Sequence, residues 1–177
     1  MSFLILINDK ILIQFGRFTE KVETMKDKMP IIGYLRNPNL KERHWVKIET
    51  LLNHKFNVNV DERLTLQLLE DLGAFGFPTE LQEIASSASS EAGLEMMLQK
   101  VEDSWKGLEF VLNHHKDAKD VFVLGTLEEI QATLDDSNIS VQTIAASRHV
   151  TPIKSQVDEW IRKLNLFAKT LVIYLAY

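Results

Sequence analysis

The sequence predicts a mainly α-helical protein, an elongated helical bundle or solenoid-like rod that carries one small β-hairpin. Apolar residues recur at intervals of three and four in several segments, which is the spacing of one helix face. Prolines and a glycine stand at the boundaries between these segments. One region combines two short β-rich pieces around a polar turn. Because the helices follow one another through short connections, each apolar face needs a neighbouring helix to cover it.

Two helices are predicted in the first third of the chain. The first covers Phe15 to Met29 and is expected to stop at Pro30, because proline removes a helix hydrogen bond. The second covers Asn39 to Asn53. The apolar faces consist of Phe18, Val22, Met25 and Met29 in the first helix, and of Leu40, His44, Trp45, Ile48, Leu51 and Leu52 in the second.

A third and a fourth helix follow. The third covers Asp61 to Leu72, and Gly73 stands where a left-handed cap is expected. Pro78 opens what the pattern predicts to be the longest helix, which extends to about Leu108. A helix of that length spans roughly 45 Å, which favours an elongated body. Serines weaken its middle, so two shorter helices with a break near residues 88–91 are the alternative.

The hairpin is predicted near residues 109–125, and helices are predicted after it. Thr126 and Glu129 have the spacing of a capping box for a helix that ends near residues 135–138. A short helix then extends to about Arg148. After Pro152 a last helix presents an apolar stripe for a partner helix, composed of Val157, Trp160 or Ile161, Leu164, Phe167 or Ala168, and Leu171.

The composition of the chain excludes several classes of protein and partner. The chain has 177 residues, 45% of them hydrophobic, which suits one packed body or one piece of a larger protein. Its net charge of -5 comes from interspersed acids and bases, so no nucleic-acid partner is expected. Cysteine is absent, which fits a cytoplasmic location. We expect no membrane partner, because no apolar run reaches the roughly 18–20 residues of a membrane-spanning helix.

The residues do not predict an enzyme. A nucleotide site needs a glycine-rich loop ending in lysine and serine or threonine, and the nearest match, at residues 124–129, has one glycine followed by acids. His114 and His115 are adjacent in the hairpin and point to opposite faces, so they are expected to be solvated turn residues, not metal ligands. His44 lies on an apolar stripe and is expected to be structural. We therefore predict no catalytic, cofactor-binding or metal-binding residues.

Several motifs, in order, resemble the dynein heavy chain family. The most specific is LKERHW, which contains Arg43, His44 and Trp45 and opens a helix after a proline-bearing stretch. An alanine, glutamate and tryptophan series follows in the long helix. The family-motif residues, all with expected structural roles, are Arg43, His44, Trp45, Glu91, Glu95, Trp105, Pro152 and Trp160.

The resemblance covers the linker region of these motors. It implies a helical rod that bends and straightens with the nucleotide cycle of an ATPase ring, and this chain would be its tail-proximal part. Residues 15–171 carry the resemblance, whereas residues 1–14 form an unplaced leader and residues 172–177 a divergent end, as in a truncated product.

The resemblance also implies partners and a location. The implied partners are the ring and tail of the heavy chain, other dynein subunits indirectly, and microtubules only through the full motor. The implied location is the cytoskeleton, with the axoneme of a cilium preferred because residues 108–125 resemble axonemal chains. The alternatives are a free-standing helical adaptor that binds partner helices, and a truncated product without a function of its own.

Overall fold

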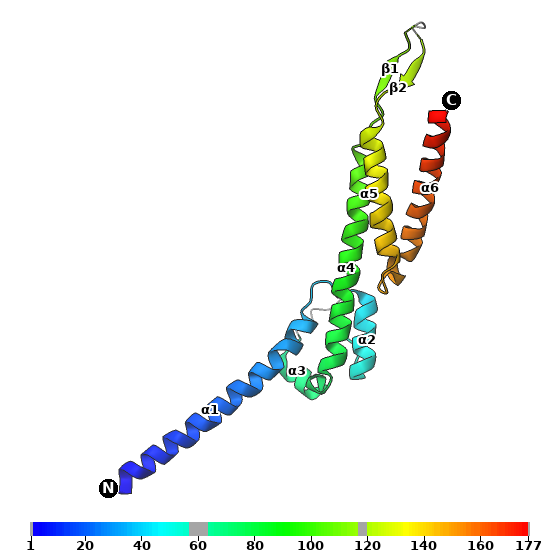
Figure 1. The fold of residues 1–177 in the computed structure, drawn as a ribbon. Coiled ribbons are helices and arrows are strands. Elements are labelled where there is room, and N and C mark those ends of the chain that lie inside the picture. The colour runs from blue at the N-terminus through cyan, green and yellow to red at the C-terminus, as the bar shows by residue number, and fades with distance from the viewer. Residues whose placement is uncertain (1, 57–63, 117–119, 177) are drawn as a thin grey trace. The chain divides into compact units, whose positions relative to one another are not determined.

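The computed structural model describes residues 2–56, 64–116 and 120–176, with side chains from residue 14 to residue 174 within those ranges. The described chain is mainly helical and contains one two-stranded antiparallel sheet (Figure 1), which confirms the predicted mainly α class with one small β-hairpin. Contacts divide the chain into two compact units, residues 1–89 and 90–177. The elements are α1 (Ser2–Leu35), α2 (Glu42–Leu52), α3 (Leu66–Asp71), η1 (Ala74–Gly76), α4 (Pro78–Lys106), β1 (Leu112–His114), β2 (Phe122–Leu124), α5 (Glu128–Ala145), η2 (Thr151–Ile153) and α6 (Lys154–Ala176).

Helix α1 extends further than predicted at both ends. Pro30 lies inside it, so the prediction that this proline ends the helix is wrong. A proline in a helix interior costs about 3 kcal/mol. Beyond it, Ile31 and Leu35 are buried in the core of the first unit, and burial of such side chains contributes roughly 1.5–3 kcal/mol each. Burial after the proline therefore offsets its local cost. With 34 residues, α1 also exceeds the 29 residues of α4, which the sequence predicts as the longest helix.

Local signals set the ends of α2 and α3. Helix α2 agrees with the prediction to within three residues, and Asn53 ends it in a left-handed conformation with φ 49°. Thr65 caps α3 by accepting a hydrogen bond from the backbone N–H of Leu68 at 3.2 Å, so α3 begins later than predicted. The first residues of the predicted third helix, 61–63, lie outside the described residues. Gly73 adopts the predicted left-handed conformation, with φ 66°.

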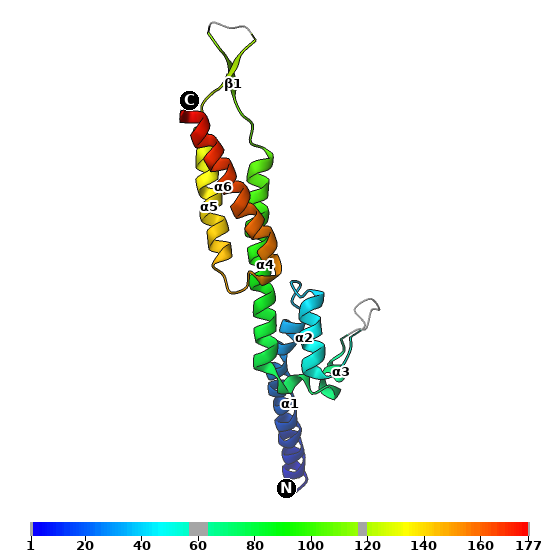
Figure 2. The same cartoon turned by 90° about the vertical axis from the view of Figure 1, so that its right-hand side faces the viewer.

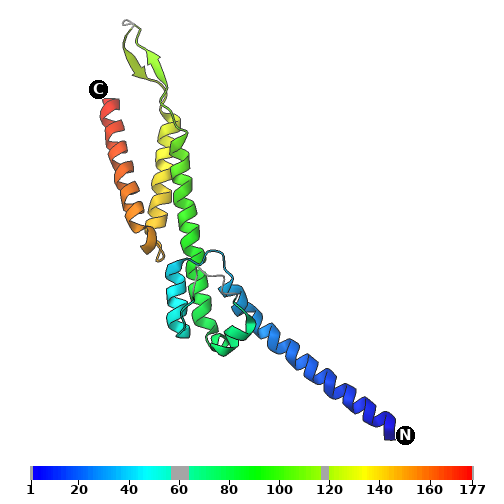
Figure 3. The same cartoon turned by 180° about the vertical axis from the view of Figure 1, so that it is seen from behind.

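The first unit packs its helices around one apolar core. In this unit α2 lies beside the first part of α4 (Figures 1 and 3). Ile48 and Leu81 are the most deeply buried large apolar side chains there, each about 1% exposed. The buried members of the core are Ile31, Leu35, Ile48, Leu52, Phe56, Leu69, Ala74 and Leu81.

Helix α4 is continuous through its serine-rich middle. It runs without interruption from Pro78 to Lys106, which excludes the alternative of two shorter helices. The boundary between the two compact units falls between Ser89 and Ser90, within this serine-rich stretch. Ala85 and Ala88 are buried while Ser86, Ser89 and Ser90 are exposed. The small alanines on the packed face explain why the helix persists where serine propensity is weak.

The predicted hairpin is present at the predicted place. Strands β1 and β2 pair antiparallel with Leu112 opposite Leu124 and His114 opposite Phe122, and the hairpin projects beyond the ends of α4 and α5 (Figure 2). The backbone N–H of Gly125 donates to the carbonyl of Val111 at 2.6 Å. A Cβ on Gly125 would lie 2.9 Å from a methyl carbon of Val111, so this position requires glycine for close approach of the two chain segments.

The second unit differs from the prediction in α5. Helix α5 continues from Glu128 to Ala145, so the predicted end near residues 135–138 and the separate short helix are wrong. The predicted capping box is also wrong, because Leu127 occupies the N-cap position and no side chain caps the helix. Leu127 is instead buried in a small apolar cluster with Ile130 and Leu171. The buried side chain of Leu127 therefore anchors the start of α5 in place of a polar cap.

Candidate functional site

A side-chain hydrogen bond in the second unit joins α4 to α5. The indole Nε1 of Trp105 donates a hydrogen bond to Ser137 Oγ at 2.9 Å, and the Ser137 side chain is buried. The ring of Trp105 also packs edge-on against Phe167 of α6, with ring centroids 5.2 Å apart. One half-buried tryptophan therefore contacts both other helices of the unit.

Trp160 lies on α6 and reaches back to α4. Its Nε1 donates to Glu102 Oε1 at 3.4 Å, a long hydrogen bond. Lys163 lies 5.7 Å from the centre of the Trp160 ring and forms a 2.7 Å ion pair with Glu159. Hydrogen bonding from Lys163 lowers the pKa of the exposed Glu159 carboxyl below its usual value. Lys163 thus places a positive charge over the ring of Trp160.

An apolar seam joins α4, α5 and α6 next to these tryptophans. Helices α5 and α6 pack against each other along their length. Ile144 and Val157 are almost completely buried in this seam, and Trp105 and Trp160 pack against it. The seam consists of Leu98, Val101, Leu134, Val141, Ile144, Ile153, Val157 and Leu164. The last helix therefore presents the predicted stripe to a partner within the same unit.

The Arg43, His44 and Trp45 triplet lies in the first turn of α2. The side chain of His44 is fully buried, and its Nδ1 accepts a hydrogen bond from the backbone N–H of Lys41 at 3.0 Å. A side chain at the third helical position that binds the N-cap backbone N–H performs one half of a capping box. Trp45 is half-buried and packs edge-on against Phe56. The triplet thus starts the helix and anchors it in the core.

Glu91 and Glu95 lie on α4, and Pro152 lies in the turn before α6. Glu91 is buried on α4 and Glu95 is half-buried on the same helix, and each has an interaction partner. Pro152 is exposed in η2, the short turn that precedes α6. Proline at the start of a helical turn has no N–H to leave unsatisfied.

Asn37 is a positioning residue that sequence reasoning missed. Its amide nitrogen donates to the Ala85 carbonyl at 3.0 Å and to Ser89 Oγ at 2.8 Å, so it ties the α1–α2 loop to α4 within the first unit. Its Oδ1 accepts from the backbone N–H of Asn39 at 3.0 Å, which forms a side-chain turn. The Asn-Pro-Asn sequence carries this signal, because asparagine before proline favours such turns.

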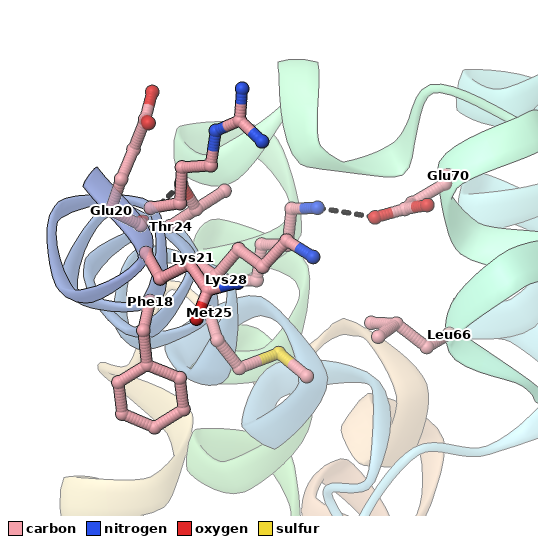
Figure 4. A pocket seen from close by; sticks show the side chains of 10 residues that line it. Phe18, Glu20, Lys21, Thr24, Met25, Lys28, Leu66 and Glu70 are labelled. Atoms are coloured by element: carbon pink, nitrogen blue, oxygen red, sulfur yellow. Dashed lines mark hydrogen bonds and ion pairs between the residues drawn. The ribbon is translucent and has the colours of Figure 1, made fainter. Parts of the chain in front are cut away.

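A surface groove of about 750 Å³ lies between α1 and α3 in the first unit. Figure 4 shows Phe18 and Met25 of α1 on one side and Leu66 of α3 on the other. Lys28 of α1 forms an ion pair with Glu70 of α3 across this groove (Figure 4). Besides these apolar side chains, α1 contributes the bases Arg17, Lys21 and Lys28 and the acid Glu20 to the lining of the groove.

The described residues offer little for chemistry. Among them, no group of three or more His, Cys, Asp or Glu side chains is placed to hold a metal ion. His114 packs against Phe122 in the hairpin, with ring centroids 4.5 Å apart. None of the described helices combines the length and apolar character needed to cross a membrane.

Comparison with known proteins identifies the family. Residues 12–176 match the family model described as dynein heavy chain, N-terminal region 2. The chain is 52% identical to dynein axonemal heavy chain 6 of Homo sapiens over 151 residues. These aligned residues make up 85% of this chain and 4% of that protein. The chain is 33% identical to human dynein axonemal heavy chain 2 and 32% identical to the dynein alpha chain of the flagellar outer arm of Chlamydomonas reinhardtii, again over 85% of this chain and 3% of each relative.

Two conclusions follow from these matches. The chain spans only a few per cent of the length of the curated relatives that it matches. The resemblance carried by the triplet of α2 and the tryptophans is confirmed, and this chain belongs to the dynein heavy chain family, in the part described as N-terminal region 2.

Proposed function

We propose that this chain is a structural, non-catalytic segment of the linker of an axonemal dynein heavy chain, where it passes movement of the ATPase ring to the rest of the motor. The observation that carries the proposal is the tryptophan-anchored seam of α4, α5 and α6, in a chain whose relatives are axonemal heavy chains. A lever needs a packed interior that resists bending between its hinges.

The family-motif residues have a mechanical role in this proposal. Trp105 and Trp160 hold α4 against its two neighbours through one hydrogen bond each. His44 and Trp45 fix the start of α2, and Arg43 belongs to the same turn. For Glu91, Glu95 and Pro152 we propose support of α4 and of the turn into α6.

The proposal also specifies partners and location. The direct partners are the ring and tail portions of the same heavy chain, and microtubules are contacted only through the complete motor. The location is the axoneme of a cilium or flagellum, in line with the axonemal and flagellar names of the relatives. Nucleotide hydrolysis belongs to other parts of the heavy chain in this proposal.

A matched pair of isoleucines on α5 tests the mechanical role. Ile144 is fully buried in the seam, whereas Ile139 is 66% exposed on the same helix. Ile144→Ala is expected to destabilise the second unit by about 2–5 kcal/mol, and Ile139→Ala by less than about 0.5 kcal/mol. In a full-length heavy chain that contains this segment, Ile144→Ala should slow microtubule gliding while ATP hydrolysis persists, and Ile139→Ala should change neither.

Two results would contradict the proposal. One is an unchanged gliding speed with Ile144→Ala when unfolding measurements show that the second unit is destabilised. The other is ATP hydrolysis by the purified 177-residue chain. A phosphate-release assay with the chain alone measures the latter directly.

The second candidate is a helical adaptor that binds partner helices. The exposed apolar face of α1 favours it, because Phe15 and Phe18 are more than 60% exposed. An adaptor acts without the ring, so it predicts specific binding by the isolated chain and no effect of Ile144→Ala on gliding.

A further inference from the structure

The exposed apolar residues of α1 follow a heptad pattern. From Phe15 to Met29 they are spaced three, four, three and four apart, which places them at alternating d and a positions of one helix face. The members are Phe15, Phe18, Val22, Met25 and Met29, between 43% and 69% exposed. A continuous apolar stripe of this length on a monomer surface marks a site of interaction.

The charges beside the stripe all have the same sign. With Phe15 at an a position, the flanking e and g positions carry Lys21, Lys26 and Lys28 and no acid between residues 14 and 29. The acids of this stretch, Glu20, Glu23 and Asp27, fall at the b and f positions, and Glu20 is among the residues that line the groove beside α3. In coiled coils the e and g charges select the partner, because they lie next to the corresponding charges of the neighbouring helix.

A second copy of α1 is a poor occupant for this face. In a parallel pair each g residue lies next to an e residue of the partner, and in an antiparallel pair g meets g and e meets e. Every such arrangement brings lysine against lysine, which is repulsive. The charge pattern therefore requires a partner with acidic flanking positions.

The structure already contains one example of that pairing. Lys28, at a g position, forms an ion pair with Glu70 of α3, and Leu66 of α3 lies across the same groove (Figure 4). Helix α3 is only six residues long and reaches the groove near its Lys28 end. An acidic helix laid along the stripe beyond α3 would extend the same contact toward Lys21 and Phe15.

We propose that the stripe of α1 docks an amphipathic helix with apolar a and d positions and acidic e and g positions, supplied by another segment of the same heavy chain. The length of the human relative supports this source: the matched part of this chain covers about 4% of that protein, so nearly all of such a polypeptide lies outside the matched region. A segment of the same chain also binds at high effective concentration. The choice of source rests on the proposed function, whereas the acidic-helix specificity does not.

A designed peptide tests the specificity on the 177-residue chain. The probe is a four-heptad helix with isoleucine and leucine at a and d and glutamate at every e and g position, labelled for fluorescence anisotropy. A control peptide carries lysine at those e and g positions. We expect binding of the acidic peptide only, and loss of the preference near 1 M salt, where the screening length is about 3 Å.

Variants of the chain separate the face from general charge effects. Lys21→Glu with Lys26→Glu should weaken binding of the acidic peptide about tenfold and admit the basic one, since two attractive pairs become repulsive. Lys47→Glu with Lys55→Glu changes the net charge equally at exposed positions away from α1 and should leave binding unchanged. Phe18→Asp should abolish binding of the acidic peptide while the circular dichroism spectrum stays that of the parent chain.

The outcomes are decisive for each part. The acidic-helix proposal would be overturned if the two peptides bind equally or if neither binds. It would also be overturned if the chain associates with itself and Phe18→Asp abolishes that association. For the source, peptides tiled across the human relative should include some that displace the designed acidic helix. If none does, the source within the heavy chain is wrong. A failed gliding test with Ile144→Ala affects only the proposed function and leaves the peptide result standing.

Discussion

Replacement of Trp105 by phenylalanine tests whether the α4–α5 anchor stabilises the second unit. Phenylalanine keeps an aromatic ring near Phe167 but removes the Nε1–H that Ser137 Oγ accepts at 2.9 Å. The Ser137 side chain is only 3% exposed, so its hydroxyl loses its partner without gaining water. An unsatisfied buried polar group costs about 1–3 kcal/mol. We therefore expect Trp105→Phe to lower the free energy of unfolding by about 1–3 kcal/mol.

A double-mutant cycle isolates the hydrogen bond from the change in packing. Ser137→Ala alone removes the acceptor, and the combined variant with Trp105→Phe removes both partners. The sum of the two single losses in free energy of unfolding should exceed the loss in the double variant by about 1 kcal/mol, which is the net contribution of one hydrogen bond. Ser140→Ala, at a partly exposed serine of the same helix, should change stability by less than about 0.5 kcal/mol.

Urea unfolding followed by circular dichroism gives these free energies, provided the slope with denaturant is unchanged. Additive single effects, within about 0.3 kcal/mol, would show that this hydrogen bond does not contribute. Trp105→Ala removes the ring as well and should cost more than Trp105→Phe, roughly 2–4 kcal/mol for a half-buried ring. An equal cost for both variants would mean that the ring does not stabilise the unit.

Three further predictions concern the hairpin, the α1–α2 loop and pH. Gly125→Ala should accelerate amide exchange in the hairpin because its Cβ would lie 2.9 Å from Val111, and Val111→Ala should relieve the effect; unchanged exchange would contradict the close approach. Asn37→Asp keeps the turn acceptor but loses both donors to α4, so it should destabilise the first unit by about 1–2 kcal/mol in urea unfolding, and no loss would refute this role. The pKa of Glu159, measured by carbon NMR, should lie below the usual value of 4.5 and should rise toward 4.5 in Lys163→Met. Because folding lowers this pKa, the stability contributed by the pair is present above pH 4.5 and is lost as the pH falls through the lowered pKa.

The sequence predicted the helices whose ends carry strong local signals. Gly73 adopts the left-handed conformation that its position after a leucine-rich stretch indicates. Pro78 opens α4, and the last helix follows Pro152 within two residues. These residues act through their own backbone restrictions, so their effect can be read without knowledge of the fold.

The errors arose where distant burial outweighs a local signal. Pro30 was expected to end α1, but Ile31 and Leu35 gain enough burial beyond it to continue the helix. The stretch at residues 135–138 has the composition of a turn, yet Ser137 faces inward to Trp105 and the helix passes through it. Neither contact is visible from one segment of sequence, because each depends on which helix lies opposite.

The same distinction applies to the surface of α1. The sequence showed an apolar stripe there, and such a stripe predicts only that some neighbour covers it. The structure adds that the stripe is exposed along Phe15 to Met29 and that Glu70 of α3 already pairs with one flanking lysine. Because the stripe is exposed, it is available to a partner outside the described structure. The basic residues at its e and g positions restrict that partner to a helix with acidic flanking positions. For this reason the charge of the flanking positions, and not the apolar stripe itself, is the feature whose reversal should change the partner of this helix.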